Sequence, residues 1–172
     1  MNSVLPNLSV IRILCIIAFS LITTLSHASG HASGKVHVVQ MLNKSTVDKK
    51  QKMVFEPSIV KVNVGDVVRF VSTDSGHNSS SIKEMLPSGA KKWESKINKD
   101  FEVTFEQDGT YGYMCTPHYG MGMVGVVLVG DHKVNYEAAK NANHRGKAKK
   151  RFKEVFAKID EQGADKFVPA HN

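Results

Sequence analysis

The side chains in this sequence that are best suited to bind a soft transition metal fall into two short segments. Cys115, His118 and two methionines, Met121 and Met123, lie within nine residues, and His77 lies 38 residues upstream in a Ser-Gly-His-Asn segment. Two imidazoles, one thiolate and one weak thioether form the ligand set of a mononuclear blue-copper site. The spacing alone leaves open whether Met121 or Met123 supplies the thioether.

Each ligand type has a chemical reason. Thiolate sulfur is soft and stabilises Cu(I), imidazole suits both Cu(I) and Cu(II), and a distant thioether donates little to either. A rigid set of ligands whose geometry is ideal for neither Cu(I) nor Cu(II) changes little when the ion gains or loses one electron. The pattern therefore predicts one copper ion per chain, alternating between Cu(I) and Cu(II), and an electron carrier with no catalytic residues of its own.

The cysteine count supports this interpretation. An apolar run of 13 residues, Ile13–Leu25, follows Arg12 and precedes a small-residue site ending at Ala28. This arrangement is typical of a secretory signal, and the run is shorter than the ~20 residues that span a membrane. We therefore expect residues 1–28 to be a signal peptide, no membrane anchor, and a mature chain whose single thiol, Cys115, needs a role in an oxidising compartment.

Other functions fit fewer of these residues. A secreted cysteine hydrolase with Cys115 as nucleophile needs a neighbouring base, but the sequence shows no oxyanion-hole motif and leaves the methionines without a role. A copper chaperone or buffer would use the same ligands and pass on ions in place of electrons. Structural zinc is disfavoured because such sites prefer four cysteine or histidine ligands.

The elements that must position these ligands read as short strands. Alternating apolar residues at Val60, Val62 and Val64 place one face inward, and residues 67–71, 101–105 and 124–129 form further strands between turn signals. Residues 74–99 read mainly as a loop with one short helical turn. Strands at this spacing, without helices between most of them, favour a β-sandwich or barrel over residues 29–130.

The last part of the chain, residues 131–172, is expected to be a helical extension packed on that domain. Residues 135–143 and 147–160 read as helices, and the second has an apolar stripe. Its stripe consists of Phe152, Val155, Phe156 and Ile159. Ten basic and six acidic residues make this tail basic, whereas residues 29–130 hold twelve and ten within a chain of net charge +7. The basic run 145–151 has no interleaved aromatics, so a solvated face is favoured over nucleic-acid binding.

Taken together, the two ligand segments resemble those of the pseudoazurins, a family of periplasmic cupredoxins that are type 1 blue-copper proteins. The likeness rests on Gly76-His77-Asn78 and on Cys115-Thr116-Pro117-His118-Tyr119-Gly120-Met121-Gly122-Met123. It extends to Met41-Leu42-Asn43-Lys44, Met53-Val54-Phe55-Glu56-Pro57, Gly65-Asp66 and Lys96-Ile97-Asn98. It covers about residues 35–159 and implies an all-β Greek-key cupredoxin sandwich of about eight strands with two C-terminal α-helices.

The resemblance also implies roles for single residues. The implied copper ligands are His77, Cys115, His118 and Met123. Around them, Asn78 would tie the two ligand loops together, Thr116 would lie beside the thiolate, and Pro117 would stiffen the loop and remove a backbone donor. Second-layer contacts of this kind orient ligands and tune the potential.

For partners, the resemblance implies a periplasmic monomer that exchanges electrons through the edge of His118. The expected partner-docking surface comprises Met53, Gly120, Met121, Lys44, Lys91 and Lys92. Lysines there would steer acidic redox proteins, such as a copper nitrite reductase in denitrification or a cytochrome c-type donor or acceptor. Ser75 and Met114 stand where pseudoazurins often carry lysine, so most of the excess charge lies in the tail.

Overall fold

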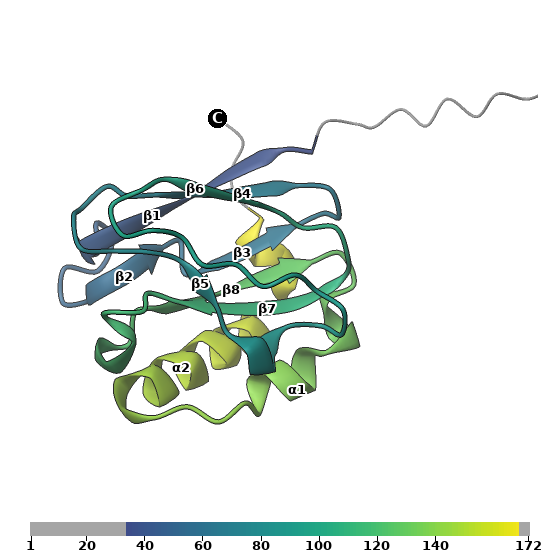
Figure 1. Cartoon of the computed structure of the whole chain (residues 1–172). Helices are drawn as coiled ribbons and strands as arrows, with labels where there is room; N and C mark the ends of the chain where they lie inside the picture. The colour runs from purple at the N-terminus through teal and green to yellow at the C-terminus, as the bar shows by residue number, and fades with distance from the viewer. Residues whose placement is uncertain (1–33, 169–172) are drawn as a thin grey trace, which may run out of the picture. The chain divides into compact units, whose positions relative to one another are not determined.

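The computed structural model describes residues 34–168, which form two packed four-stranded sheets with helices on one side (Figure 1). The first sheet has the order β2-β1-β4-β6 and the second the order β3-β8-β7-β5. The strands are β1 (Val36–Lys44), β2 (Lys52–Glu56), β3 (Ile59–Val62), β4 (Val67–Val71), β5 (Ser80–Ser81), β6 (Phe101–Thr104), β7 (Gly109–Met114) and β8 (Val124–Val129). The helices are α1 (Tyr136–Lys140) and α2 (Gly146–Gln162), and single 3₁₀ turns are η1 (Lys83–Met85), η2 (Tyr119–Met121), η3 (His132–Val134) and η4 (Ala164–Phe167).

Both sheets contain parallel as well as antiparallel strand pairs. β1 runs parallel to β4, and β3 runs parallel to β8, while the other pairs are antiparallel. In β1 the burial alternates, so that His37, Val39 and Met41 face inward. This is the pattern of strands with one solvated face. The eight strands and two helices confirm the predicted fold class.

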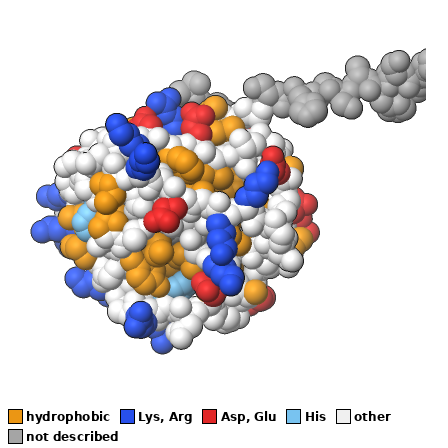
Figure 2. Space-filling model, viewed as in Figure 1, with side chains coloured by type: hydrophobic (Ala, Val, Ile, Leu, Met, Phe, Trp, Pro, Cys, Tyr) orange, Lys and Arg blue, Asp and Glu red, His pale blue; other side chains and the backbone are white. Residues whose placement is uncertain are grey.

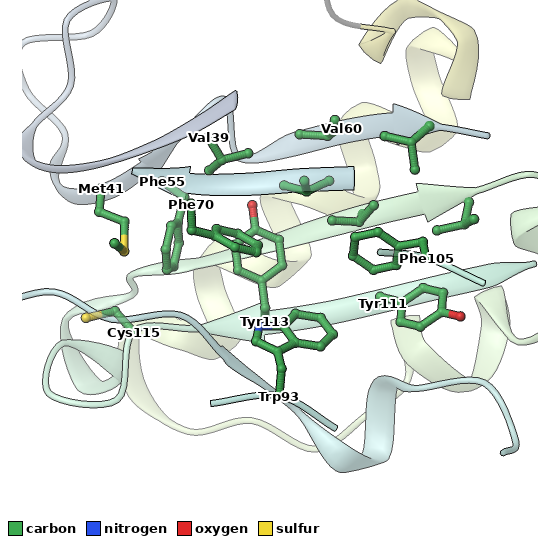
Figure 3. Close-up of a cluster of buried hydrophobic side chains, with 14 of the residues drawn as sticks. Val39, Met41, Phe55, Val60, Phe70, Trp93, Phe105, Tyr111, Tyr113 and Cys115 are labelled. Atoms are coloured by element: carbon green, nitrogen blue, oxygen red, sulfur yellow. The ribbon is translucent and has the colours of Figure 1, made fainter. Parts of the chain in front are cut away.

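The space between the sheets is filled by a hydrophobic cluster that combines aromatic side chains with valines and methionines (Figure 3). Phe55, Phe70, Trp93 and Tyr113 meet at ring-centroid distances of 4.7 to 6.5 Å, mostly edge to face. Such contacts add to the free energy gained from burying the rings themselves. Cys115 lies at one end of this cluster in Figure 3, and it belongs to the same buried cluster as the aromatic rings.

β8 is buried along its whole length because both of its faces are covered. One face meets the core between the sheets, and the other meets α1 and α2. The residues of α2 on that side are Ala148, Phe152, Val155, Phe156 and Ile159. The predicted apolar stripe of the second helix is therefore confirmed, and the helix packs on the sheet as expected.

The strand β3 ends earlier than the sequence pattern predicts. Val64 is 48% exposed, so the predicted inward face of the third strand is correct for Val60 and Val62 but wrong for Val64. The reason is that β3 ends at Val62 and a turn follows, in which Gly65 takes a φ of 93°.

The predicted signal peptide, residues 1–28, lies outside the described residues, and within residues 34–168 no helix is long and apolar enough to cross a membrane.

Candidate metal centre

Three of the predicted ligands lie together at one end of the sandwich. The Nδ1 atoms of His77 and His118 are 3.1 Å apart, and the Sγ atom of Cys115 lies 3.7 Å from the first and 3.5 Å from the second. Among residues 34–168 this is the one group of histidine, cysteine or carboxylate side chains that is close enough to hold a metal ion. The structure therefore brings together donors that are up to 41 residues apart in sequence.

The local backbone explains how the loop carries two of these donors. Cys115 follows directly after β7, and its N–H donates to the carbonyl oxygen of Met123, which directly precedes β8. Between them, the carbonyl oxygen of His118 accepts from the N–H groups of Met121 and Met123. Gly122 takes a φ of 87°, the left-handed conformation that glycine adopts without strain. The loop is thus closed by its own hydrogen bonds.

His77 is held in one orientation and one tautomer. Its side chain is fully buried, and its Nε2 lies 3.0 Å from the Oδ1 of Asn43. Because an amide oxygen only accepts, Nε2 carries the proton and Nδ1 presents its lone pair to the thiol. Burial lowers the pKa of the His77 imidazole, and the neighbouring His118 lowers it further. The side chain is therefore prepared as a neutral metal ligand.

The thiol of Cys115 is fully buried, and Asn78 connects its loop to the loop of His77. Burial raises the pKa of the Cys115 thiol, while hydrogen bonds from the backbone N–H groups of Asn78 and His118 oppose the rise. The side chain of Asn78 accepts from the N–H of Thr116 at 2.8 Å and donates to the Oγ1 of Thr116 and the carbonyl of Ser95, each at 3.2 Å. A thiol without solvent access is poorly placed to attack a substrate, which argues against the hydrolase alternative.

The two methionines differ sharply in burial. Met123 is fully buried and belongs to the same hydrophobic cluster as Cys115, whereas Met121 is 44% exposed. A thioether that completes a buried site must come from a buried residue. This contrast favours Met123 as the weak axial ligand and leaves Met121 on the surface beside it.

The separations of the donor atoms fit a bound transition-metal ion, and the donor types fit copper. Two donors bound to one ion, at about 2.0 Å for nitrogen and about 2.3 Å for sulfur, lie roughly 3 to 4 Å apart. All three separations in this group fall in that interval. The lone pair of His77 Nδ1 faces the other two donor atoms, and a cation between the three would be stabilised by it. Two imidazoles, one thiolate and a nearby thioether suit copper better than zinc.

The residues of the expected docking surface differ in their exposure and in their position in the fold. Pro117, Gly120 and Met121 are exposed around the half-buried His118, Met53 is partly buried against the hydrophobic core, and Lys44 is exposed at the end of β1, next to Asn43. Lys91 and Lys92 line a groove along β6 that includes none of the four candidate copper ligands. In that groove the Nζ of Lys91 pairs with Glu106 at 3.0 Å.

The structure also shows contacts that the sequence did not indicate. Asn43 contacts His77 from β1, although these residues are 34 positions apart. The start of α2 lies against the ligand loop, where three basic residues and one acidic residue line a pocket with Met121: Lys147, Lys150, Arg151 and Glu154. The basic tail, which in the sequence looked separate from the metal ligands, therefore borders their loop (Figure 1).

Comparisons with known proteins agree with this geometry. The family model for copper-binding proteins of the plastocyanin/azurin family matches residues 41–130. Among curated proteins, the chain is 47% identical over 124 residues to the pseudoazurin of Paracoccus pantotrophus, covering 72% of this chain and 83% of that one. It is 39% identical over 143 residues to the pseudoazurin of Methylorubrum extorquens, covering 83% and 91%.

A solved structure with a similar fold belongs to the same group of proteins. The crystal structure of native pseudoazurin from Hyphomicrobium denitrificans matches with a TM-score of 0.67 at 41% sequence identity, covering 72% of this chain and 98% of that chain. The residues that the family model matches, 41–130, contain both ligand segments. The chain therefore belongs to the plastocyanin/azurin family of copper-binding proteins and, within that family, to the pseudoazurins.

Proposed function

We propose that this copper electron-transfer protein holds its single copper ion with His77, Cys115, His118 and Met123 and carries single electrons between redox proteins of the periplasm. The observation that carries the proposal is the convergence of three donor atoms within 4.8 Å of one another. The fixed tautomer of His77 and the burial of Met123 support the same ligand set.

Bound copper supplies a reversible one-electron couple, Cu(II)/Cu(I). The protein's part is to hold the ligands so that neither oxidation state moves them. Asn43 fixes the ring of His77, the Asn78 side chain joins the two ligand loops, and the backbone of Met123 closes the loop onto Cys115. Ligands held by such contacts lose little energy to reorganisation when the charge changes.

His118 is the proposed port for electrons. It is the ligand with partial solvent exposure, while His77, Cys115 and Met123 are fully buried. Pro117, Gly120 and Met121 are exposed around it. Figure 2 shows, at the left edge of the molecule, a histidine side chain among hydrophobic side chains, with lysine or arginine side chains nearby. An apolar patch of this kind suits brief contact with a partner and excludes water from the contact.

Charge around the port favours an acidic partner. Lys44 is exposed on β1, and Lys147 and Lys150 are exposed at the start of α2, next to Met121. These residues would substitute for the positive charge that Ser75 and Met114 do not provide. Electrostatic attraction speeds association and weakens with salt. A copper nitrite reductase with an acidic docking face is our candidate acceptor, and a cytochrome c is a candidate donor.

The proposal is tested by loading the mature protein with one equivalent of Cu(II). We expect an intense blue absorption and a reversible one-electron couple, and we expect Cys115→Ser to lose the blue colour because a hydroxyl supplies no sulfur-to-copper transition. A colourless Cu(II) complex would refute the type 1 site. Copper transfer to an apo-acceptor without a reversible couple would instead indicate a copper chaperone or buffer.

Partner choice needs a separate measurement. The rate of electron transfer to an acidic redox protein should fall as ionic strength rises, because salt screens exposed charges beyond about 10 Å at 0.1 M. Lys147→Glu combined with Lys150→Glu should weaken that dependence, whereas Lys91→Glu combined with Lys92→Glu, in the groove along β6, makes the same change in net charge and serves as the matched control. Equal effects of the two changes would contradict a docking face at the start of α2.

A further inference from the structure

The loop that carries His118 and Met123 rests against the start of α2. If Gly122 had a Cβ atom, it would lie 3.2 Å from the carbonyl oxygen of Lys147, so the two backbones are in close contact. A Cβ on Gly146 would lie 4.0 Å from the carbonyl oxygen of Gly120. Figure 1 shows the turn between β7 and β8 beside the first turn of α2. Residues 144–147 therefore form a seat for the ligand loop.

Tyr119 connects the loop to this seat through its hydroxyl group. The oxygen lies 2.9 Å from the Nδ1 of His144, which is hydrogen-bond distance. A tyrosine hydroxyl both donates and accepts, so it forms this hydrogen bond with Nδ1 of a neutral imidazole in either tautomer.

The surroundings of His144 show what a histidine adds at this position. Its side chain is 7% exposed and stacks on Phe152, with ring centroids 4.2 Å apart and an interplanar angle of 27°. Its buried Nε2 has no hydrogen-bond partner within residues 34–168. An unsatisfied buried polar group destabilises the folded state, and an apolar ring would stack on Phe152 without that cost. The gain specific to histidine is the hydrogen bond between its Nδ1 and the hydroxyl group of Tyr119.

We infer that His144 is a positioning residue for the copper ligands His118 and Met123, acting through Tyr119. The inference rests on the proposed function, since it takes those two residues as ligands. Tyr119 follows His118 directly, and the turn η2 that it begins ends two residues before Met123. The carbonyl of His118 accepts from the N–H groups of Met121 and Met123, so a shift of the turn moves both ligands together.

The test uses four variants of the copper-loaded protein. Tyr119→Phe removes the hydroxyl group and keeps the ring. His144→Phe keeps a ring against Phe152 and removes Nδ1, whereas His144→Asn keeps an acceptor at the δ position and serves as the rescue variant. Tyr136→Phe is the matched control, because its hydroxyl makes a comparable hydrogen bond, 2.7 Å to Asp160, between the two helices.

Three readouts separate positioning from simple stability. We expect Tyr119→Phe and His144→Phe to change the intensity ratio of the visible thiolate-to-copper bands, to shift the reduction potential, and to speed release of Cu(I) to an excess of chelator. A lost hydrogen bond of about 1 kcal/mol corresponds to about a fivefold faster release if loop opening limits it. His144→Asn should match the wild type, and Tyr136→Phe should lower stability without changing these readouts.

The double variant of Tyr119→Phe with His144→Phe should equal either single variant, because both remove the same contact. The inference is overturned if the two single variants match Tyr136→Phe in band ratio, potential and release rate, or if their effects add in the double variant. If His144→Phe does not fold, Tyr119→Phe and His144→Asn decide the question. A wild-type protein that binds no blue copper would refute the proposed function itself, which is a different result.

Discussion

Asn78 is the residue whose removal should most clearly separate stability from copper chemistry. Replacing it with alanine removes three hydrogen bonds, two to Thr116 and one to the carbonyl of Ser95. Each hydrogen bond contributes about 1 kcal/mol net, which gives a total of about 3 kcal/mol. Thr116 is exposed, so water replaces part of this loss. We expect Asn78→Ala to lower the free energy of unfolding by about 2 kcal/mol, or about 30-fold in the unfolding equilibrium.

Asn135 provides a matched control near the opposite end of β7. Its side chain also makes three hydrogen bonds, accepting from the N–H of Thr110 at 2.7 Å and donating to the carbonyls of Thr110 at 2.9 Å and Met85 at 3.5 Å. Thr110 lies at the start of β7, whereas Cys115 follows its end. Asn135→Ala should therefore cost a similar free energy of unfolding without disturbing the metal ligands.

The assay is urea denaturation of the copper-free proteins, followed by the fluorescence of the buried Trp93. Copper is left out because a ligand that binds the folded state adds its own stabilisation. The visible spectrum and reduction potential of the copper-loaded forms are then compared. The reasoning is refuted if Asn78→Ala lowers the free energy of unfolding by less than about 0.5 kcal/mol. It is equally refuted if the potential shifts no more than in Asn135→Ala.

Three further predictions follow from single features. Met123→Leu should keep copper and raise the reduction potential, because a weak donor to Cu(II) is lost. Met121→Leu should change the potential little. Voltammetry that shows the reverse would make Met121 the axial ligand. Gly125→Ala should lower the free energy of unfolding by about 1–3 kcal/mol, because the new Cβ would overlap the ring of Tyr113, and an unchanged urea midpoint would contradict this. Burial lowers the pKa of His132 below its ordinary value of 6.5, so its contribution to stability is present above that pH and is lost as pH falls through the lower folded pKa. His132→Gln should therefore lose less stability than the wild type between about pH 7.5 and pH 5.5, and parallel pH curves would count against this role.

Local patterns in the sequence were enough for most of the fold. Strand alternation and the apolar stripe of the second helix depend on residues a few positions apart, and they predicted the sandwich and the buried residues Phe152 and Ile159 correctly. The prediction for Val64 was wrong because an alternating pattern does not show where a strand ends. The turn at Gly65, which follows directly, was visible in the sequence and marks that boundary.

Contacts between distant elements could not be read in this way. The partnership of Asn43 with His77 depends on the register of β1 beside the ligand loop, and no local spacing encodes it. The seat that His144 provides for Tyr119 depends on where α2 packs on β8. By contrast, Cys115 and His118 were predictable, because one short loop carries both and their chemistry is unusual in a chain with so few cysteines.

The burial of β8 on both faces has a consequence for any attempt to divide this chain. The family match ends at residue 130, just after β8, and a protein cut there would retain the sheets and all four candidate ligands. It would also expose the outer apolar face formed by Ile59, Val126 and Leu128, which α1 and α2 now cover. An apolar sheet face open to water favours aggregation. The shortest soluble copper protein obtainable from this chain should therefore include α2.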